Sequence, residues 1–122
     1  MKHIFIAHPL GADTEEVIEA NLSRAVRWYK WCCDNYPQHS FEGTWMLNCM
    51  VYDDRDEDAR ALGIRRSMNV LEHCDELWIC GGEVTPGMAA EITMMKLMQK
   101  PSFDLTMLGA EPPEGPLAEA AV

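Results

Sequence analysis

The chain has 122 residues, of which 20 are acidic and 10 are basic, so its formal charge is −10. This length supports one domain with a single core, and an apolar content of 48% is ordinary for a globular protein. The charge excludes binding to polymeric nucleic acid, because phosphate contacts need clustered Lys and Arg and the basic residues here are scattered. No run approaches the roughly 18 apolar residues of a membrane span, so we expect no membrane partner.

An apolar segment near the start of the chain, residues 2–7, predicts a first strand. Its apolar residues at 4–7 do not alternate with polar ones, which is typical of a strand buried on both faces of an α/β sheet. His8 follows at the carboxyl end of the strand, the edge where open α/β sheets bind ligands. The segment is too short and wrongly flanked for a signal peptide, so we expect a cytoplasmic protein.

The five cysteines indicate neither a disulfide framework nor a metal site. They are Cys32, Cys33, Cys49, Cys74 and Cys80, an odd number without a Cys-x-x-Cys pair. Reduced, mostly buried thiols are the expected state in the cytoplasm. We therefore expect no bound metal.

A long helix is predicted over residues 14–35. Either Asp13 or Thr14 could cap it, and the two glutamates that follow complement the helix dipole. Apolar residues at helical spacing give the helix one buried stripe, which ends in a dense group of aromatic residues at 28–31. We expect this group to pack in the core or between subunits rather than to stack on a base.

Residues 38–52 show no helical period in the sequence. A parallel sheet built from the remaining elements needs its second strand here, either at 39–43 or within 45–51. We favour an extended segment that spans parts of both.

The acidic run at 53–58 leads into a helix predicted over residues 57–73. Two interpretations of this run are open. Its acids stabilise the start of the helix from a solvated loop, or Asp53 and Asp54 contact a ligand. No His or Cys follows at metal-ligand spacing. Arg60 lies where it could reach a phosphate or carboxylate at the sheet edge.

The most informative stretch covers residues 74–99. An apolar run at 76–80 predicts a third strand, two glycines at 81–82 interrupt it, and the Thr-Pro-Gly sequence at 85–87 opens an apolar helix. A strand, a glycine turn and a helix N-terminus form a pocket for a polar or anionic ligand. Glu91 is the one carboxylate of that helix and should point back toward its start.

The last elements are a fourth strand at 103–108 and a loose tail at 109–122, which is rich in Pro, Gly, Ala and Glu. The order β-α-β-α-β-α-β predicts an α/β domain over residues 1–108. Its sheet should be parallel, with right-handed crossovers and helices on both faces.

Three segments together resemble small bacterial and phage members of the nucleoside 2-deoxyribosyltransferase-like superfamily. They are IFIAHPL (residues 4–10), DDRDEDARALG (53–63) and CDELWICGGEVTPGMAAEI (74–92). The resemblance extends over residues 3–108. It implies a flavodoxin-like three-layer sandwich with a parallel sheet of four to five strands, and a homodimer or higher homo-oligomer.

The resemblance also implies a site. In the enzymes of that superfamily, a glutamate at the position of Glu91 attacks the anomeric carbon of a nucleoside, so Glu91 is the expected catalytic nucleophile. The expected ligand is a nucleoside or nucleotide, and no cofactor is implied. The residues expected to contact this ligand are His8, Asp53, Asp54, Arg60, Gly82, Thr85, Gly87 and Met88.

Several residues depart from the pattern of the active enzymes, among them Ser67 or Arg66, near which a second aspartate of these enzymes aligns, and Thr44-Trp45, where many close relatives have a Pro-His pair. Phe5 stands where they have the tyrosine that orients the nucleophile, and Thr85 stands where they have an aspartate that contacts the base. Two hypotheses follow: an enzyme that cleaves or transfers an N-glycosidic bond, and a nucleotide-binding module that no longer turns over. A third reading, a structural protein, predicts a filled cleft at the strand edge.

Overall fold

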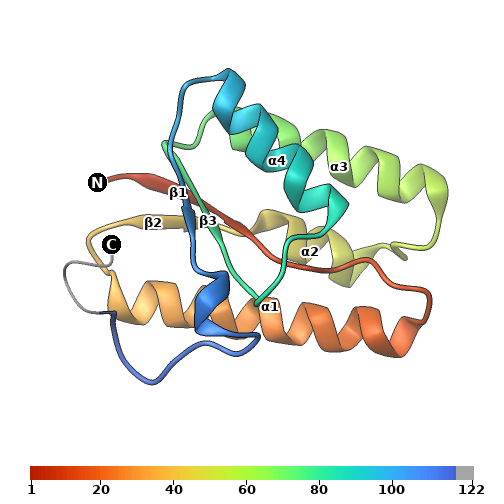
Figure 1. The fold of residues 1–122 in the computed structure, drawn as a ribbon. Helices are drawn as coiled ribbons and strands as arrows, with labels where there is room; N and C mark the ends of the chain where they lie inside the picture. Colours follow the sequence, from red (N-terminus) through yellow and green to blue (C-terminus); the bar gives the residue numbers. More distant parts are fainter. Residues whose placement is uncertain (118–122) are drawn as a thin grey trace.

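The computed structural model describes residues 1–117 (Figure 1). In chain order the elements are β1 (His3–Ala7), α1 (Glu15–Asn35), β2 (Ser40–Glu42), α2 (Thr44–Val51), α3 (Glu57–Glu72), β3 (Glu76–Ile79), α4 (Pro86–Leu97), β4 (Ser102–Asp104) and the 3₁₀ helix η1 (Thr106–Leu108). Within these residues no helix is long and apolar enough to cross a membrane.

The described strands form one parallel sheet in the order β2-β1-β3-β4. β1 lies inside the sheet, with Phe5 paired to Glu42 of β2 on one side and to Leu77 of β3 on the other. The chain runs outward from β1 to β2 and then crosses back to β3, so right-handed crossovers place helices on both faces. This confirms the predicted α/β class and the flavodoxin-like three-layer sandwich.

The sheet separates two hydrophobic clusters. Figure 1 shows the helical layers on its two faces, with α1 on one face and α3 and α4 on the other. The first joins Ile4, Ile6, Trp78 and Cys80 to Ala25, Trp28, Trp31 and Cys32 of α1. The second joins Phe5, Ala7, Leu77 and Ile79 to Leu71 of α3 and to Met88 and Met95 of α4. Neighbouring residues of one strand enter opposite clusters, because side chains alternate across a strand. This explains the uninterrupted apolar runs of β1 and β3.

The prediction for residues 38–52 was half wrong. A short second strand, Ser40–Glu42, is present as expected, but Thr44–Val51 forms the helix α2 instead of extended chain. Gly43 separates the two elements at the N-cap of the helix. The strand ends early, and the indole Nε1 of Trp45 donates to the Ile6 carbonyl at 2.9 Å. In this way α2 supplies a hydrogen-bond partner to β1 where β2 no longer does.

The end of the described chain also differs from the prediction. β4 has only three residues, and Thr106–Leu108 continues as a 3₁₀ helix rather than as strand. Residues 109–117 lie against α1 rather than projecting as a loose tail; the carbonyls of Ala110 and Gly115 accept hydrogen bonds from Trp28 and Trp31 at 2.8 and 2.9 Å. Residues 118–122 of the predicted tail lie outside the described part.

Candidate functional site

A cavity of about 710 Å³ opens beside the carboxyl end of β1, between α2, α3 and the N-terminus of α4. Its position agrees with the general rule that open α/β sheets bind ligands outside the carboxyl ends of their strands. The residues expected at the site that line it are His8, Asp53, Asp54, Arg60, Thr85, Gly87, Met88 and Glu91. The fold therefore brings residues from four separate segments of the chain to one cavity.

The N-terminus of α4 is held by its own side chains. Thr85 is the N-cap and its Oγ1 accepts from the Met88 amide at 3.4 Å, while the Thr85 amide lies 3.5 Å from the Met88 sulfur. Pro86 occupies the first turn, where its fixed φ favours the helix and its missing amide costs nothing. This geometry fixes the start of α4 and places Glu91 in the cavity wall, one turn beyond Met88.

Glu91 lies in an apolar environment without a charge partner. Among the described residues its carboxylate takes part in no hydrogen bond shorter than 3.5 Å and in no ion pair shorter than 4.0 Å. Burial raises the pKa of Glu91 from 4.5 to about 8. At neutral pH the free protein therefore holds Glu91 mainly in its protonated form. A strongly shifted carboxylate in a cavity is typical of a functional group.

His8 is 5% exposed and borders the cavity from the end of β1. Its Nδ1 lies 2.7 Å from the Pro9 carbonyl oxygen, which accepts a hydrogen bond when Nδ1 carries the proton. Nε2 is then a lone-pair acceptor, and it is buried without a partner among the described residues. Burial lowers the pKa of His8 from 6.5 to about 4, so the ring is neutral at physiological pH.

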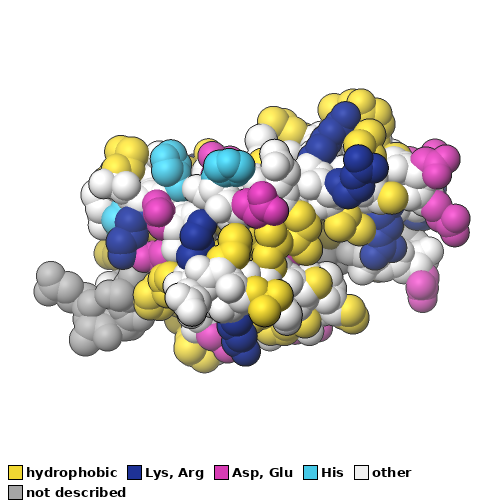
Figure 2. All heavy atoms as spheres, turned by 90° about the horizontal axis from the view of Figure 1, so that it is seen from above, with side chains coloured by type: hydrophobic (Ala, Val, Ile, Leu, Met, Phe, Trp, Pro, Cys, Tyr) yellow, Lys and Arg dark blue, Asp and Glu magenta, His cyan; other side chains and the backbone are white. Residues whose placement is uncertain are grey.

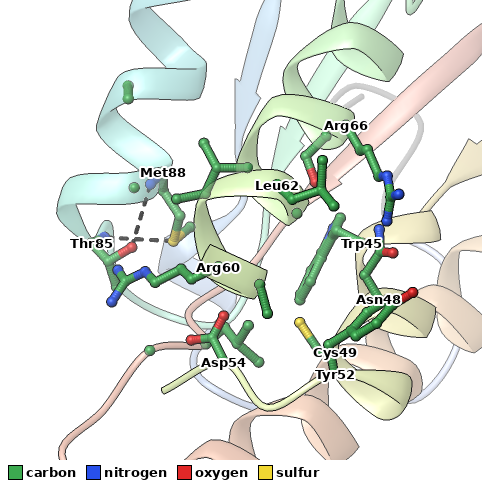
Figure 3. A pocket seen from close by; sticks show the side chains of 18 of the residues that line it. Trp45, Asn48, Cys49, Tyr52, Asp54, Arg60, Leu62, Arg66, Thr85 and Met88 are labelled. Carbon is green, nitrogen blue, oxygen red and sulfur yellow. Dashed lines mark hydrogen bonds between the residues drawn. The ribbon is translucent and has the colours of Figure 1, made fainter. Parts of the chain in front are cut away.

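The two neighbouring aspartates have different surroundings. Asp53 is exposed and accepts from the Arg55 amide at 2.9 Å, and this hydrogen bond is the main cause of its lowered pKa. Asp54 is partly buried, and this burial raises its pKa; the nearby guanidinium of Arg60 opposes the shift. Figure 3 shows the Asp54 carboxylate, the Arg60 side chain and Thr85 near one another at the cavity. Asp54 therefore fits a ligand contact better than Asp53 does.

Gly82 is the one expected contact that does not line the cavity. A side chain at this position would meet the chain after η1, since a Cβ built there lies 2.9 Å from the amide nitrogen of Ala110. Gly82 thus permits the close approach of residues 109–110 to the end of β3. Its predicted role in ligand binding is not supported by its place in the fold.

The sequence reasoning missed a whole wall of the cavity. Trp45, Asn48, Cys49 and Tyr52 line it from α2 and the residue that follows (Figure 3). Their spacing of i, i+3, i+4 and i+7 is that of one helix face. The signal was hidden because the residues between them, such as Leu47 and Met50, are apolar as well.

Arg66, Ser67 and Met68 of α3 complete the lining on the same side. Among the described residues no group of three or more His, Cys, Asp or Glu side chains is arranged to hold a metal ion.

Comparison with known proteins places the chain in a family. No curated protein and no solved structure matches it. A family described as a domain of unknown function, DUF7768, matches residues 2–104, which include every strand and helix from β1 to β4. The chain therefore belongs to the DUF7768 family.

Proposed function

We propose that the protein cleaves or transfers the N-glycosidic bond of a nucleoside or nucleotide, with Glu91 as the nucleophile. The observation that carries the proposal is the place of Glu91: one carboxylate, without a charge partner among the described residues, in the wall of a 710 Å³ cavity at the carboxyl edge of the sheet. A carboxylate can displace a base from the anomeric carbon and form a glycosyl ester, as in retaining glycosidases. The resemblance to nucleoside 2-deoxyribosyltransferases supports the same role.

The remaining lining residues suit the two halves of a nucleoside. Trp45 and Tyr52 offer aromatic surface for a base, and Asp54 and Asn48 offer polar groups. His8 contributes a buried, neutral ring to the wall of the cavity. This division of apolar and polar lining is typical of small-molecule sites.

The proposal is tested by incubating the protein with deoxynucleosides and mononucleotides and measuring released base by chromatography. Glu91→Gln is expected to lower the rate by about a thousandfold or more, because an amide cannot form the glycosyl ester. Glu83→Gln is the matched control, since Glu83 is exposed on the loop before α4 and does not line the cavity. If the wild type releases no base from any nucleoside or nucleotide, neutral or cationic, the reaction is wrong.

A binding module that has lost turnover is the second candidate. Phe5, at the position of the orienting tyrosine, has no hydroxyl to offer to Glu91, and its ring is packed in the core. Thr85, at the position of the base-contacting aspartate, caps α4 instead. This candidate predicts that the wild type binds a nucleoside in calorimetry but releases no base, and that Glu91→Gln still binds it.

We also propose that the chain forms a homodimer or higher homo-oligomer through α2. This helix has no charged residue and exposes Leu47, Met50 and Val51, of which Val51 is 71% exposed. Such an exposed apolar surface is typical of subunit contacts. Val51→Lys is expected to shift the sedimentation coefficient toward that of a monomer, whereas Leu97→Lys, at an exposed apolar residue of α4, should not. A wild type that sediments as a monomer at all concentrations contradicts the proposal.

A further inference from the structure

The cavity wall carries more negative than positive charge. It is lined by five acidic residues, Asp13, Asp53, Asp54, Asp58 and Glu91, and by two basic ones, Arg60 and Arg66. Figure 2 shows acidic side chains gathered at the end of the molecule where Figure 1 places the starts of α1 and α3. Arg55, outside the lining, pairs with Asp53 at 3.4 Å, and a smaller excess of negative charge remains even when Glu91 is protonated. Such a wall attracts a cation and disfavours a phosphate group.

Ionised Glu91 has no compensating charge in the free protein. Neither Arg60 nor Arg66 forms an ion pair with it among the described residues, and burial alone accounts for its raised pKa. A positive charge on the ligand, close to Glu91, would supply the missing partner and ionise the carboxylate on binding. The nucleophile would then become active only in the complex.

The protons that the described lining residues, Glu91 apart, offer to a departing neutral base are weakly acidic ones: those of the Tyr52 hydroxyl and of the Cys49 thiol, whose pKa burial raises to about 11. A base that leaves from a neutral nucleoside needs a proton at the moment the bond breaks. His8 has its one ring proton directed at the Pro9 carbonyl, and Asp53, whose pKa the hydrogen bond from the Arg55 amide lowers, is ionised at neutral pH. Glu91 holds a proton but must lose it to act as the nucleophile. A base that carries a positive charge needs no proton, because it leaves as a neutral molecule.

Two aromatic rings line the same cavity. The Trp45 indole is held in place by its hydrogen bond to the Ile6 carbonyl, and Tyr52 follows on the same face of α2. Aromatic faces attract cations through their quadrupole, most strongly where water is excluded. The aromatic residues and the acids of the cavity thus favour the same kind of ligand.

We propose that the substrate is a cationic N-glycoside, a nucleoside whose base is quaternised at the glycosidic nitrogen, as in a pyridinium nucleoside. The inference rests on the proposed function. The bond from the anomeric carbon to nitrogen breaks, both electrons stay on the nitrogen and neutral base leaves, while a Glu91 oxygen bonds to the carbon. Water then hydrolyses the glycosyl ester, its oxygen going to the sugar and one proton to solvent, which restores the Glu91 carboxylate.

The first arm of the test measures binding without turnover. 1-Methylnicotinamide is a pyridinium cation, and nicotinamide is its neutral counterpart; neither has a glycosidic bond. In calorimetry at pH 7 the cation is expected to bind roughly tenfold or more tightly, since its charge faces the acidic wall. Glu91→Gln should reduce this preference and Glu83→Gln should retain it. Equal binding of the two compounds by the wild type overturns the inference.

The second arm measures release of base. Nicotinamide riboside is expected to be cleaved at least about a hundredfold faster than thymidine or deoxyadenosine, because its base leaves without a proton. Neutral deoxynucleosides cleaved equally fast overturn the inference and leave the proposed reaction standing. If no nucleoside releases base, whichever compound binds, the proposed reaction itself is overturned. The two failures are therefore distinguishable.

Discussion

The wild type is expected to lose stability as the pH rises from 4.5 to 8. Replacing Glu91 by glutamine is expected to abolish most of this loss. In the unfolded chain Glu91 ionises near pH 4.5, whereas the folded protein keeps its proton up to about pH 8. Between these values the folded state binds more protons, so the free energy of unfolding falls as the pH rises. At about 1.4 kcal/mol for each unit, the loss approaches about 4 kcal/mol at pH 8. Glutamine has no acidic proton to lose, so the variant avoids this loss of stability.

Urea denaturation of the wild type and Glu91→Gln at intervals from pH 5 to pH 8.5 measures this effect. The two proteins should be similarly stable at pH 5, and the variant should be the more stable one at pH 8. Glu83→Gln is the control, and its profile should follow that of the wild type. Parallel profiles for the wild type and Glu91→Gln would show that the carboxylate is already ionised in the folded protein.

Gly81→Ala is expected to destabilise the fold by about 3 kcal/mol, without any change in the cavity acids. Gly81 has a φ of +95°, which side-chain-bearing residues rarely adopt. A Cβ there would lie 2.7 Å from both the His8 ring and the Pro9 ring. Both rings are buried and cannot move aside, so strain and overlap both contribute.

Gly63→Ala is the matched comparison. Gly63 lies within α3, and a Cβ there meets no atom within 4 Å. Alanine should stabilise the protein by about 0.5–1 kcal/mol, because glycine is the weaker helix former. Thermal or urea denaturation measures both variants. If Gly81→Ala is as stable as the wild type, the turn after β3 is not held as tightly against His8 as the structure shows.

Some features of the candidate site follow from local sequence patterns, and others depend on tertiary contacts. The strand, the glycine turn and the capped helix at Thr85 are local features with strong sequence signals, and Glu91 follows from them by helical spacing. The contacts of Gly82 cannot be predicted from local sequence, because its spatial neighbour Ala110 is distant in the chain. Asp53 and Asp54 are likewise alike in sequence, and they are distinguished by the burial of Asp54 and by the hydrogen bond that Asp53 accepts from the Arg55 amide.

The sequence by itself determined the fold class, since the apolar runs of β1 and β3 and the amphipathic α1 can be buried only in a layered parallel sheet. It also indicated the edge of the sheet at which the cavity lies, because His8 and the glycine turn each follow a strand. The helix α2 and the contacts of residues 109–117 were decided only by tertiary structure. For α2 the physical reason is that a largely apolar segment has no visible period, so its conformation depends on the surfaces it contacts. For residues 109–117 the reason is that their hydrogen-bond partners, Trp28 and Trp31, are distant in the chain.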